Sequence, residues 1–369
     1  MGAGSKARIR PRIFVRNEAS ESRSGRMLGN LDRWSLFGFW DLDFGISQSL
    51  AATGQVPPVG VRHPKEPMST TTPIIEIKNL TRRYGKADAV NGLSLTVQPG
   101  RCYGFFGRNG AGKTTTIKCL LNLLRPTDGS VRIFGLDPQK DEVAVKSRLA
   151  YVPDAVAFYP WMTVRETLEY LASFRCHWNR DLEADLLKRF QLDPTKKTGA
   201  LSKGQRTQLA LIGAIAPEPE LLLLDEPTSG LDPIVRREFI ETVIGAYQSG
   251  DPTKRTVFVS THLISEFEGL IDEFTIIEEG RELMTMDAEA ARARFRKIRA
   301  RFADTPPPLD LAGALQVRQS GRELEILANG TSEKLLATLE AARAEDVRCE
   351  SLSLEEIFVA SKTLMKGGA

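Results

Sequence analysis

The stretch at 107–114 constrains this chain more than any other part of its sequence. It matches the pattern G-x-x-x-x-G-K-[ST], a glycine-rich turn that joins a strand to a helix and holds phosphate groups. A β-like run over 101–106 precedes it and a helical pattern over 112–124 follows it, as this geometry requires. Its residues are Gly107, Arg108, Asn109, Gly110, Ala111, Gly112, Lys113 and Thr114.

Each part of this phosphate loop (107–114) has a physical role. Glycines allow consecutive backbone N–H groups to point toward the α- and β-phosphates, and the following helix adds its positive N-terminal end. Lys113 can reach the β- and γ-phosphate oxygens, and Thr114 can bind Mg²⁺. The sequence therefore predicts a nucleotide site at this turn.

A second motif is an apolar run at 221–224 that ends in two acids, Asp225 and Glu226. A buried parallel strand typically has this form, and it delivers its last side chains to the carboxyl edge of a sheet. We expect Asp225 to hold Mg²⁺ through water and Glu226 to be the general base that orients the attacking water. Taken alone, the run also fits a core strand followed by a solvated turn.

Short strand patterns and helical patterns alternate from residue 74 to about 285. Such alternation predicts a mainly parallel sheet covered by helices. The expected strands are 74–78, 92–97, 101–106, 131–134, 149–152, 221–224, 256–260 and 274–277, and the expected helices are 112–124, 164–174, 182–190, 202–216 and 233–248.

The remainder, 286–369, predicts a small C-terminal α+β accessory domain. Strand patterns at 297–302, 315–317 and 323–327 and a helix at 332–342 surround a break of three prolines at 306–308. The basic run 292–301 fits a solvated face, with contact to anionic headgroups as the alternative.

The first 67 residues differ from the rest in charge and composition. They hold ten Lys/Arg and six Asp/Glu, whereas the remaining 40 basic and 41 acidic residues nearly cancel. We expect residues 1–67 to be a mis-assigned extension or a disordered tail, with a basic aromatic segment lying on anionic lipid as the alternative. The nearly neutral remainder argues against a nucleic-acid partner.

Two further compositional features exclude other classes. The longest apolar runs stop far short of the ~18 residues that a membrane-spanning helix needs. The four cysteines are too far apart for a zinc knuckle and too few for a disulfide scaffold, which fits a reducing compartment.

With the sequence Leu-Ser-Lys-Gly-Gln at 201–205, these motifs closely resemble the ATP-binding cassette (ABC) ATPase family. The resemblance covers residues 74 to about 285, with the motifs in the family's order and spacing. It implies an α/β P-loop NTPase fold of the ABC type: a mainly parallel sheet, an antiparallel β subdomain and a helical subdomain at about 155–216.

The resemblance also implies roles for single residues. Tyr84 matches the aromatic residue that stacks on adenine, Ser-Gly-Leu-Asp at 229–232 matches the D-loop, and His262 matches the switch histidine that contacts the γ-phosphate. The expected catalytic residues are Glu226, His262 and Lys113, and the expected metal ligands are Thr114, Asp154 and Asp225. Beyond the phosphate loop, the expected nucleotide contacts are Tyr84, Thr115, Ser202, Gly204 and Gln205.

One chain holds only half of a complete site, because the signature (201–205) starts a helix with an anion-binding end and nothing of its own to bind. In the family, this end closes over the γ-phosphate held by another subunit. The resemblance therefore implies a head-to-tail dimer, a homodimer as first choice, with two sandwiched ATP molecules as well as Mg²⁺.

Two positions depart from the family pattern. Asp154 stands where most members have a glutamine that senses Mg²⁺. It could still bind the metal, but it adds negative charge near the phosphates. Lys203 replaces the usual first glycine of the signature, and it could either direct charge toward the opposite nucleotide or point into solvent.

Two segments resemble ABC ATPases that power bacterial exporters with separate membrane subunits. The aromatic stretch 158–166 is either core packing or a docking surface for such a subunit, and 353–358 extends the likeness. We therefore expect a Mg²⁺-dependent transport ATPase on the cytoplasmic face of a membrane. The rivals are an importer subunit, a soluble ABC protein of translation or DNA repair, and a regulatory module without turnover.

Overall fold

The computed structural model describes residues 72–248 and 255–366. The expectations for residues 1–67 lie outside this range. All the described residues belong to one compact unit.

A six-stranded sheet with the order β5-β6-β7-β3-β8-β9 forms the main layer. Its strands are β3 (Cys102–Gly107), β5 (Leu149–Val152), β6 (Leu221–Asp225), β7 (Thr256–Thr261), β8 (Glu273–Glu278) and β9 (Arg281–Asp287). All neighbours are parallel except β8 and β9, which form an antiparallel pair. The strands that carry the two main motifs, β3 and β6, are both interior strands of this sheet.

A smaller antiparallel sheet has the order β2-β1-β4. It consists of β1 (Ile75–Tyr84), β2 (Ala87–Val97) and β4 (Asp128–Ile133). Its apolar residues share one core with α1 and with one face of the main sheet.

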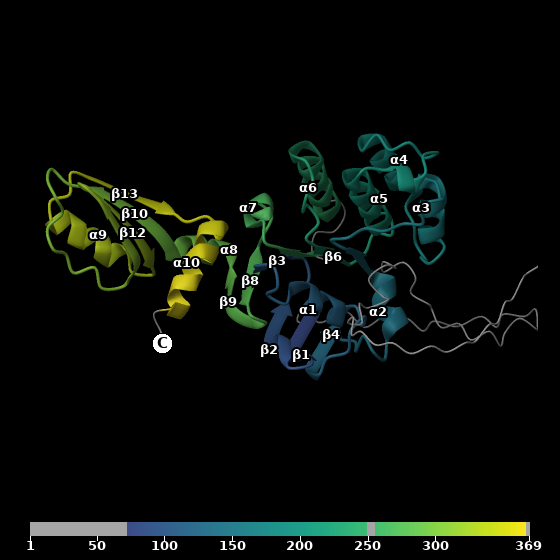
Figure 1. Cartoon of the computed structure of the whole chain (residues 1–369), viewed down its shortest axis with the longest axis horizontal. Coiled ribbons are helices and arrows are strands. Elements are labelled where there is room, and N and C mark those ends of the chain that lie inside the picture. The colour runs from purple at the N-terminus through teal and green to yellow at the C-terminus, as the bar shows by residue number, and fades with distance from the viewer. Residues whose placement is uncertain (1–71, 249–254, 367–369) are drawn as a thin grey trace, which may run out of the picture. The chain divides into compact units, whose positions relative to one another are not determined.

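The helices of the region up to residue 267 are α1 (Lys113–Leu120), α2 (Glu142–Arg148), α3 (Val164–Ala172), α4 (Arg180–Arg189), α5 (Lys203–Ile215), α6 (Pro233–Gln248) and α7 (Ile264–Phe267). Helix α3 begins at a capping box, in which Thr163 and Glu166 satisfy each other's backbone N–H groups. Figure 1 shows their order along the chain by colour.

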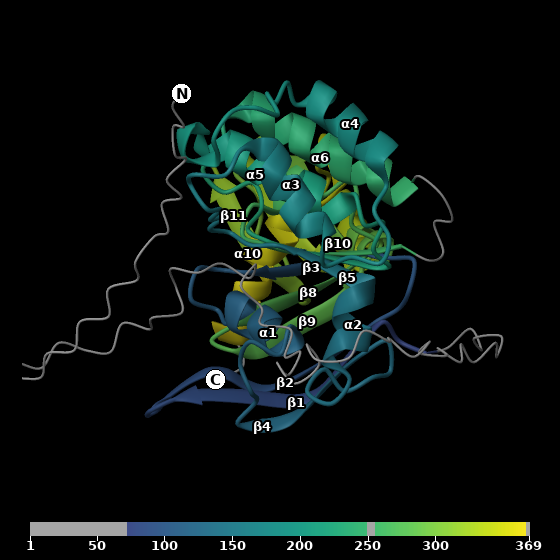
Figure 2. The ribbon, with the colours of Figure 1, turned by 90° about the vertical axis from the view of Figure 1, so that its right-hand side faces the viewer.

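Strand β6 explains how the two faces of the main sheet are covered. Leu222 and Leu224 pack into a core with α3, α5 and α6, whereas Leu221 and Leu223 pack into the core that holds α1. Because successive strand side chains point to opposite faces, an uninterrupted leucine run fits a strand buried on both sides. Figure 2 shows β3, β5 and β8 between α1 on one side and α3, α5 and α6 on the other.

The C-terminal region forms a four-stranded antiparallel sheet with the order β11-β12-β10-β13. Its elements are β10 (Phe295–Arg301), β11 (Ala314–Ser320), β12 (Glu323–Asn329), α9 (Ser332–Ala341) and β13 (Asp346–Ser351). Ile298, Ile326 and Leu335 are among the residues of its own small core, which joins one face of the sheet to α9.

Two C-terminal helices instead share a core with the main sheet. Helices α8 (Ala288–Arg294) and α10 (Leu354–Lys366) contribute Ala291 and Ile357 to that core. The backbone N–H of Leu354 also donates to Glu268 at 2.8 Å. The region therefore has one core of its own and two helices that pack elsewhere.

Three of the six basic residues in the run 292–301 form ion pairs with acids of the same chain. Arg292 lies 3.8 Å from Glu268, Arg299 pairs with Glu325 at 3.3 Å, and Lys297 pairs with Glu356. Much of this run therefore faces acidic side chains of its own chain.

The expected fold class is confirmed, including the antiparallel β sheet, the helices between 155 and 216 and the C-terminal α+β region. The exact domain boundaries remain a prediction. The structure adds α2, α7, α8, α10, β9 and β13, which the sequence patterns did not predict. Five of these six elements have seven residues or fewer by their bounds, too few for periodicity to indicate a structure.

Candidate functional site

The phosphate loop joins the carboxyl end of β3 to α1, and two backbone bonds fix its shape. The N–H of Ala111 donates to the C=O of Arg108 at 3.1 Å, and the N–H of Gly280 donates to the C=O of Ala111 at 3.0 Å. The loop is thus closed on itself and attached to the turn between β8 and β9.

Helix α1 begins without a side-chain cap. Its N-cap residue is Gly112, which supplies no acceptor, and its first turn contains no acid. The first N–H groups of a helix lack partners within the helix, and the helix dipole places positive charge there. The start of α1, which includes Thr114 and Thr115, is therefore suited to an anion.

Two glycines of the loop have left-handed backbone conformations. A Cβ on Gly110 (φ 85°) would meet nothing within 4 Å, so there is open space where the loop must admit a ligand. A Cβ on Gly112 (φ 102°) would lie 2.4 Å from the carbonyl oxygen of Ala89. Only glycine fits this second position, because that contact is with backbone.

The side chain of Lys113 is buried and turned back onto its own loop. Its Nζ donates to the C=O of Gly107 at 2.8 Å and to the C=O of Arg108 at 3.2 Å. The same Nζ lies 2.9 Å from Oε1 of Glu226, in an ion pair. The structure therefore brings together the two motifs that the sequence places 113 residues apart.

Asp225 is the last residue of β6, and its carboxylate is buried. Oδ1 accepts from Oγ of Ser260 at 2.9 Å, whereas Oδ2 has no hydrogen-bond partner in the protein. Burial raises the pKa of Asp225, against the opposing effect of the Thr114 and Ser260 hydroxyls. A buried carboxylate oxygen without a partner, beside a threonine hydroxyl, fits the oxygen ligands that Mg²⁺ prefers.

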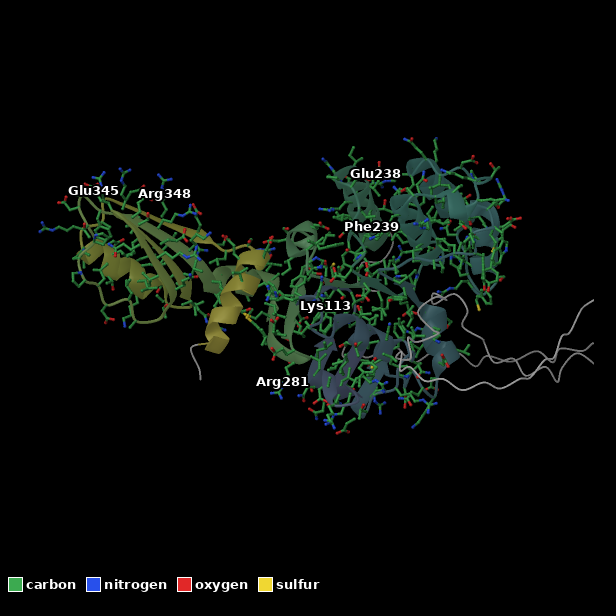
Figure 3. The ribbon with its side chains drawn as sticks, viewed as in Figure 1. Lys113, Glu238, Phe239, Arg281, Glu345 and Arg348 are labelled. Atoms are coloured by element: carbon green, nitrogen blue, oxygen red, sulfur yellow. The ribbon has the colours of Figure 1, made fainter. Side chains whose placement is uncertain are left out.

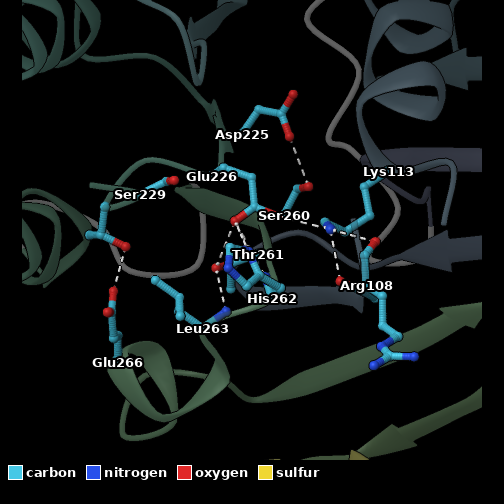
Figure 4. Close-up of polar contacts among 12 residues, drawn as sticks. Arg108, Lys113, Asp225, Glu226, Ser229, Ser260, Thr261, His262, Leu263 and Glu266 are labelled. Carbon is cyan, nitrogen blue, oxygen red and sulfur yellow. Dashed lines mark hydrogen bonds and ion pairs between the residues drawn. The ribbon is translucent and has the colours of Figure 1, made fainter. Parts of the chain in front are cut away.

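Glu226 follows in a left-handed conformation (φ 46°), which is uncommon for a residue with a side chain. Its Oε2 lies 2.7 Å from Nδ1 of His262, and 3.3 Å from both Oγ1 of Thr261 and the backbone N of His262. Figure 4 shows Glu226 facing Lys113 on one side and His262 on the other. Such backbone strain is often retained where a side chain must be aimed.

A cavity of about 540 Å³ lies beside the loop. The phosphate loop provides Arg108, Asn109, Gly110 and Ala111, and His262 reaches it from the end of β7. The remaining lining residues, which the sequence reasoning missed, are Glu278, Glu279 and Phe358. Glu278 ends β8 and Glu279 lies in the turn after it, where no motif marks them. Phe358 lies on α10, in the segment 353–358 that resembles exporter ATPases, but nothing in that segment indicates a nucleotide contact.

The expected signature contacts lie at the start of α5. Ser202 is its N-cap and accepts from the N–H of Gln205, while the Gln205 side chain accepts from the N–H of Ser202. Gln205 is thus engaged in a capping box. A Cβ on Gly204 would lie 3.2 Å from Cγ1 of Val235, so α5 packs closely on the start of α6.

The side chain of Lys203 is exposed, as one of its two expectations has it, and a role toward an opposite nucleotide stays a prediction. Its Nζ donates to the C=O of Ser229 at 2.6 Å, within the D-loop segment of the same chain. The side chain therefore bridges the signature and the D-loop.

Two other expected residues are not brought to this cluster. Tyr84, at the end of β1, is 46% exposed, with the Arg82 guanidinium 4.7 Å from its ring centre, and it does not line the cavity. Asp154 is exposed in the segment that follows β5. Because β5 and β6 are parallel, that segment leaves the same sheet edge as Asp225.

A polar network that the sequence reasoning missed connects the D-loop to α7. The hydroxyl of Thr228 donates to Glu266, and Arg236 pairs with Glu266 at 2.7 Å. Arg236 also donates to the C=O of Leu231 at 3.1 Å. Helix α7 begins two residues after His262, so this network joins the D-loop to the segment that positions His262.

The chain is similar in sequence to known proteins. The model of the ABC transporter family matches residues 90–229. The bacitracin transport ATP-binding protein BcrA of Bacillus licheniformis is 36% identical over 226 residues, or 61% of this chain and 73% of that protein. The Nod factor export ATP-binding protein I of Burkholderia orbicola (strain AU 1054) is 37% identical over 214 residues, or 57% of this chain and 69% of that protein.

A solved structure of the ATP-binding subunit of an ABC transporter superposes with a TM-score of 0.54 at 27% identity. The match covers 60% of this chain and 92% of that chain.

Proposed function

This chain belongs to the ABC transporter family of ATP-binding proteins, and we propose that it hydrolyses Mg²⁺-bound ATP to drive export through separate membrane subunits. One observation carries the hydrolysis: the Glu226 carboxylate directly follows a buried strand and faces both Lys113 and His262. A carboxylate held at this edge can accept a proton from water that attacks a phosphate held by the loop.

We assign the steps to residues as follows. The loop N–H groups and the start of α1 bind the phosphates, and Lys113 exchanges its carbonyl partners for phosphate oxygens. Thr114 and Asp225 would hold the Mg²⁺ that accompanies ATP, and this ion would supply positive charge to the phosphates. Glu226 takes the proton of the attacking water, while His262 fixes the carboxylate and contacts the γ-phosphate. Asp154 remains a proposed metal ligand, and Tyr84 a proposed adenine contact.

We further propose that two copies of the chain complete two sites. Each copy offers one phosphate loop and one signature, whose Ser202 and Gly204 start a helix with an anion-binding end. In a head-to-tail dimer, the signature of each copy would close over the nucleotide of the other. ATP would then stabilise the dimer, and its hydrolysis would release it.

The proposed contact with the membrane subunit is an aromatic surface, formed by Tyr159, Trp161, Tyr170 and Phe174. The rings of Tyr159 and Trp161 lie 4.9 Å apart, and Tyr170 meets Phe174 edge to face at 5.0 Å. Trp161 is 65% exposed, and Phe174 is also exposed. Exposed aromatic clusters of this kind are typical of protein interfaces.

This assignment places the chain on the cytoplasmic face of the cell membrane as a peripheral protein. None of the helices in the described residues has both the length and the apolar character needed to cross a bilayer. Export is supported by the names of the bacitracin and Nod factor relatives.

The test is purification of the full chain from detergent-solubilised native membranes, with identification of its partners by mass and a phosphate-release assay on the complex. We expect a stoichiometric polytopic membrane protein and ATP hydrolysis that Glu226→Gln abolishes. Recovery only with ribosomes or DNA would contradict transport, and a co-purified extracellular substrate-binding protein would indicate import. ATP binding without phosphate release would contradict the hydrolytic assignment.

A further inference from the structure

Lys203 joins two segments that are separate in the sequence. It is the first residue of α5, and its Nζ donates to the C=O of Ser229, 26 residues further along the chain, at 2.6 Å. Ser229 lies in the turn between β6 and α6, three residues after Glu226. The ammonium group thus connects the start of the signature helix to the turn that follows the proposed base.

The geometry of the D-loop fits this lysine closely. Gly230 has a φ of 69°, and a Cβ on it would lie 2.9 Å from Nζ of Lys203. The lysine therefore lies directly beside the glycine that forms the turn. Its exposed side chain is fixed by this carbonyl and by the form of the turn.

The same two helices meet at two further points. Gly204 lies against Val235, and Nε2 of Gln208 donates to Oε2 of Glu238 at 3.1 Å. Glu238 lies on α6, in the upper part of the view in Figure 3. Helix α5 is therefore attached to α6 over more than one turn, and Lys203 extends that attachment to the D-loop itself.

On its other side, the D-loop is bonded to α7, which begins two residues after His262. Thr228 donates to Glu266 of α7, and Arg236 bonds both Glu266 and the C=O of Leu231. A continuous set of contacts thus leads from α5 through the D-loop to the segment that holds His262 against Glu226.

We propose that Lys203 is a positioning residue that ties the signature end of α5 to the D-loop, and so aligns Glu226 and His262 for hydrolysis. The proposal rests on the proposed function. Lys203 has no contact with the phosphate loop, so its loss should change turnover and leave the ATP affinity of the chain's own loop unchanged.

The test compares Lys203→Met with the wild-type full chain in a steady-state phosphate-release assay. Methionine keeps most of the apolar stem and removes the donor, so we expect kcat to fall about three- to tenfold with KM for ATP and Tm unchanged. Lys203→Arg retains a charged donor and should recover part of kcat. Lys188→Met removes an exposed lysine from α4 and is the matched control for lost charge.

Two outcomes would overturn the proposal. A normal kcat in Lys203→Met would show that the bond does not position the site, and a raised KM with normal kcat would show that the ammonium binds nucleotide instead. A failure of the proposed function would be seen separately, in Glu226→Gln. If the base assignment is wrong, Glu226→Gln hydrolyses ATP at the normal rate, whatever the rate of Lys203→Met.

Discussion

Nζ of Lys113 lies 2.9 Å from Oε1 of Glu226, so the cation expected to bind phosphate is paired with the carboxylate expected to act as base. Both side chains are buried, and an unpaired charge there would be costly. The ion pair therefore offsets the two buried charges. Phosphate oxygens that take over Lys113 would free one oxygen of Glu226 for water, while His262 retains the other.

The first prediction concerns Glu226→Gln. Removal of a general base typically lowers the rate by about 10²- to 10⁴-fold, and we expect steady-state phosphate release to fall by that factor. Nucleotide affinity should be retained or raised, because glutamine competes less well for Lys113. Equilibrium binding of a fluorescent ATP analogue measures the second effect.

The control for this variant is Glu220→Gln. Glu220 directly precedes β6, whereas Glu226 directly follows it, and Glu220 pairs with Arg148 at 2.7 Å. The two variants make the same chemical change at opposite ends of one strand. Equal rates for Glu226→Gln and Glu220→Gln would refute the base assignment.

The second prediction is that Asp225→Asn stabilises the nucleotide-free protein at neutral pH. Burial raises the pKa of Asp225 in the folded state above the value of about 3.9 that an unfolded chain has. Between these two pKa values the folded state binds more protons, so the free energy of unfolding of the wild type falls as pH rises. Asparagine removes this effect and can still accept from Ser260.

Thermal unfolding measured from pH 4 to pH 7 checks this sign. The Tm of Asp225→Asn should exceed that of the wild type at pH 7, and the difference should shrink toward pH 4. Asp193→Asn is the control, and its Tm at pH 7 should change in the opposite direction. Bonds from the Thr195 N–H and hydroxyl lower the pKa of the exposed Asp193, so this carboxylate stabilises the fold when charged. A Tm gain in Asp225→Asn that does not vary with pH would argue against a buried charge.

Asp225→Asn should also respond more weakly to Mg²⁺. Phosphate release at saturating ATP should need a much higher Mg²⁺ concentration, because an amide oxygen binds the cation less well than a carboxylate.

The sequence predicted the phosphate loop and β6 well, because their signals are local. In both, a run of neighbouring residues specifies the strand, the turn and the residue at its end. Lys203 shows where such reasoning stops: its partner Ser229 is a backbone carbonyl, which has no side-chain signal in the sequence. The ion pairs of the basic run 292–301 are also tertiary contacts, and nothing in the run itself indicates them.

The two ends of the C-terminal region illustrate a second limit of prediction from sequence patterns. Pattern reasoning predicted β12 and α9, which form a small core within one continuous segment. It did not predict α10, whose Ile357 packs on the distant main-sheet core. Phe358 on the same helix lines the cavity beside the phosphate loop, a position that depends entirely on this packing.

The third prediction contrasts two glycines. Gly112→Ala would place a Cβ 2.4 Å from the Ala89 carbonyl oxygen at a φ of 102°, so the loop must move. We expect ATP binding to weaken at least 100-fold and the free energy of unfolding to fall by about 1–3 kcal/mol. Gly245→Ala is the control. Gly245 lies on the exposed side of α6, and a Cβ on it would have no atom within 4 Å.

Gly245→Ala should raise the free energy of unfolding by about 0.5–1 kcal/mol, because alanine has less conformational freedom to lose in a helix. Urea unfolding with a nucleotide-binding assay separates the two effects. Normal ATP binding by Gly112→Ala would contradict the inferred loop geometry.

The last prediction tests the aromatic surface through Trp161→Ala. Trp161 is 65% exposed, so its removal should change the free energy of unfolding by less than about 1 kcal/mol and leave the ATPase rate of the isolated chain unchanged. Its loss from an interface is a different matter, because tryptophan anchors often contribute ~2 kcal/mol or more to binding, equivalent to about a 30-fold loss of affinity. We therefore expect recovery with the membrane fraction to fall, together with substrate-stimulated turnover.

Val143→Ala is the matched control, since Val143 on α2 is also 65% exposed and lies outside the aromatic surface. If both variants remain equally bound to the membrane fraction, the partner docks elsewhere; if Trp161→Ala alone unfolds, the cluster serves packing instead.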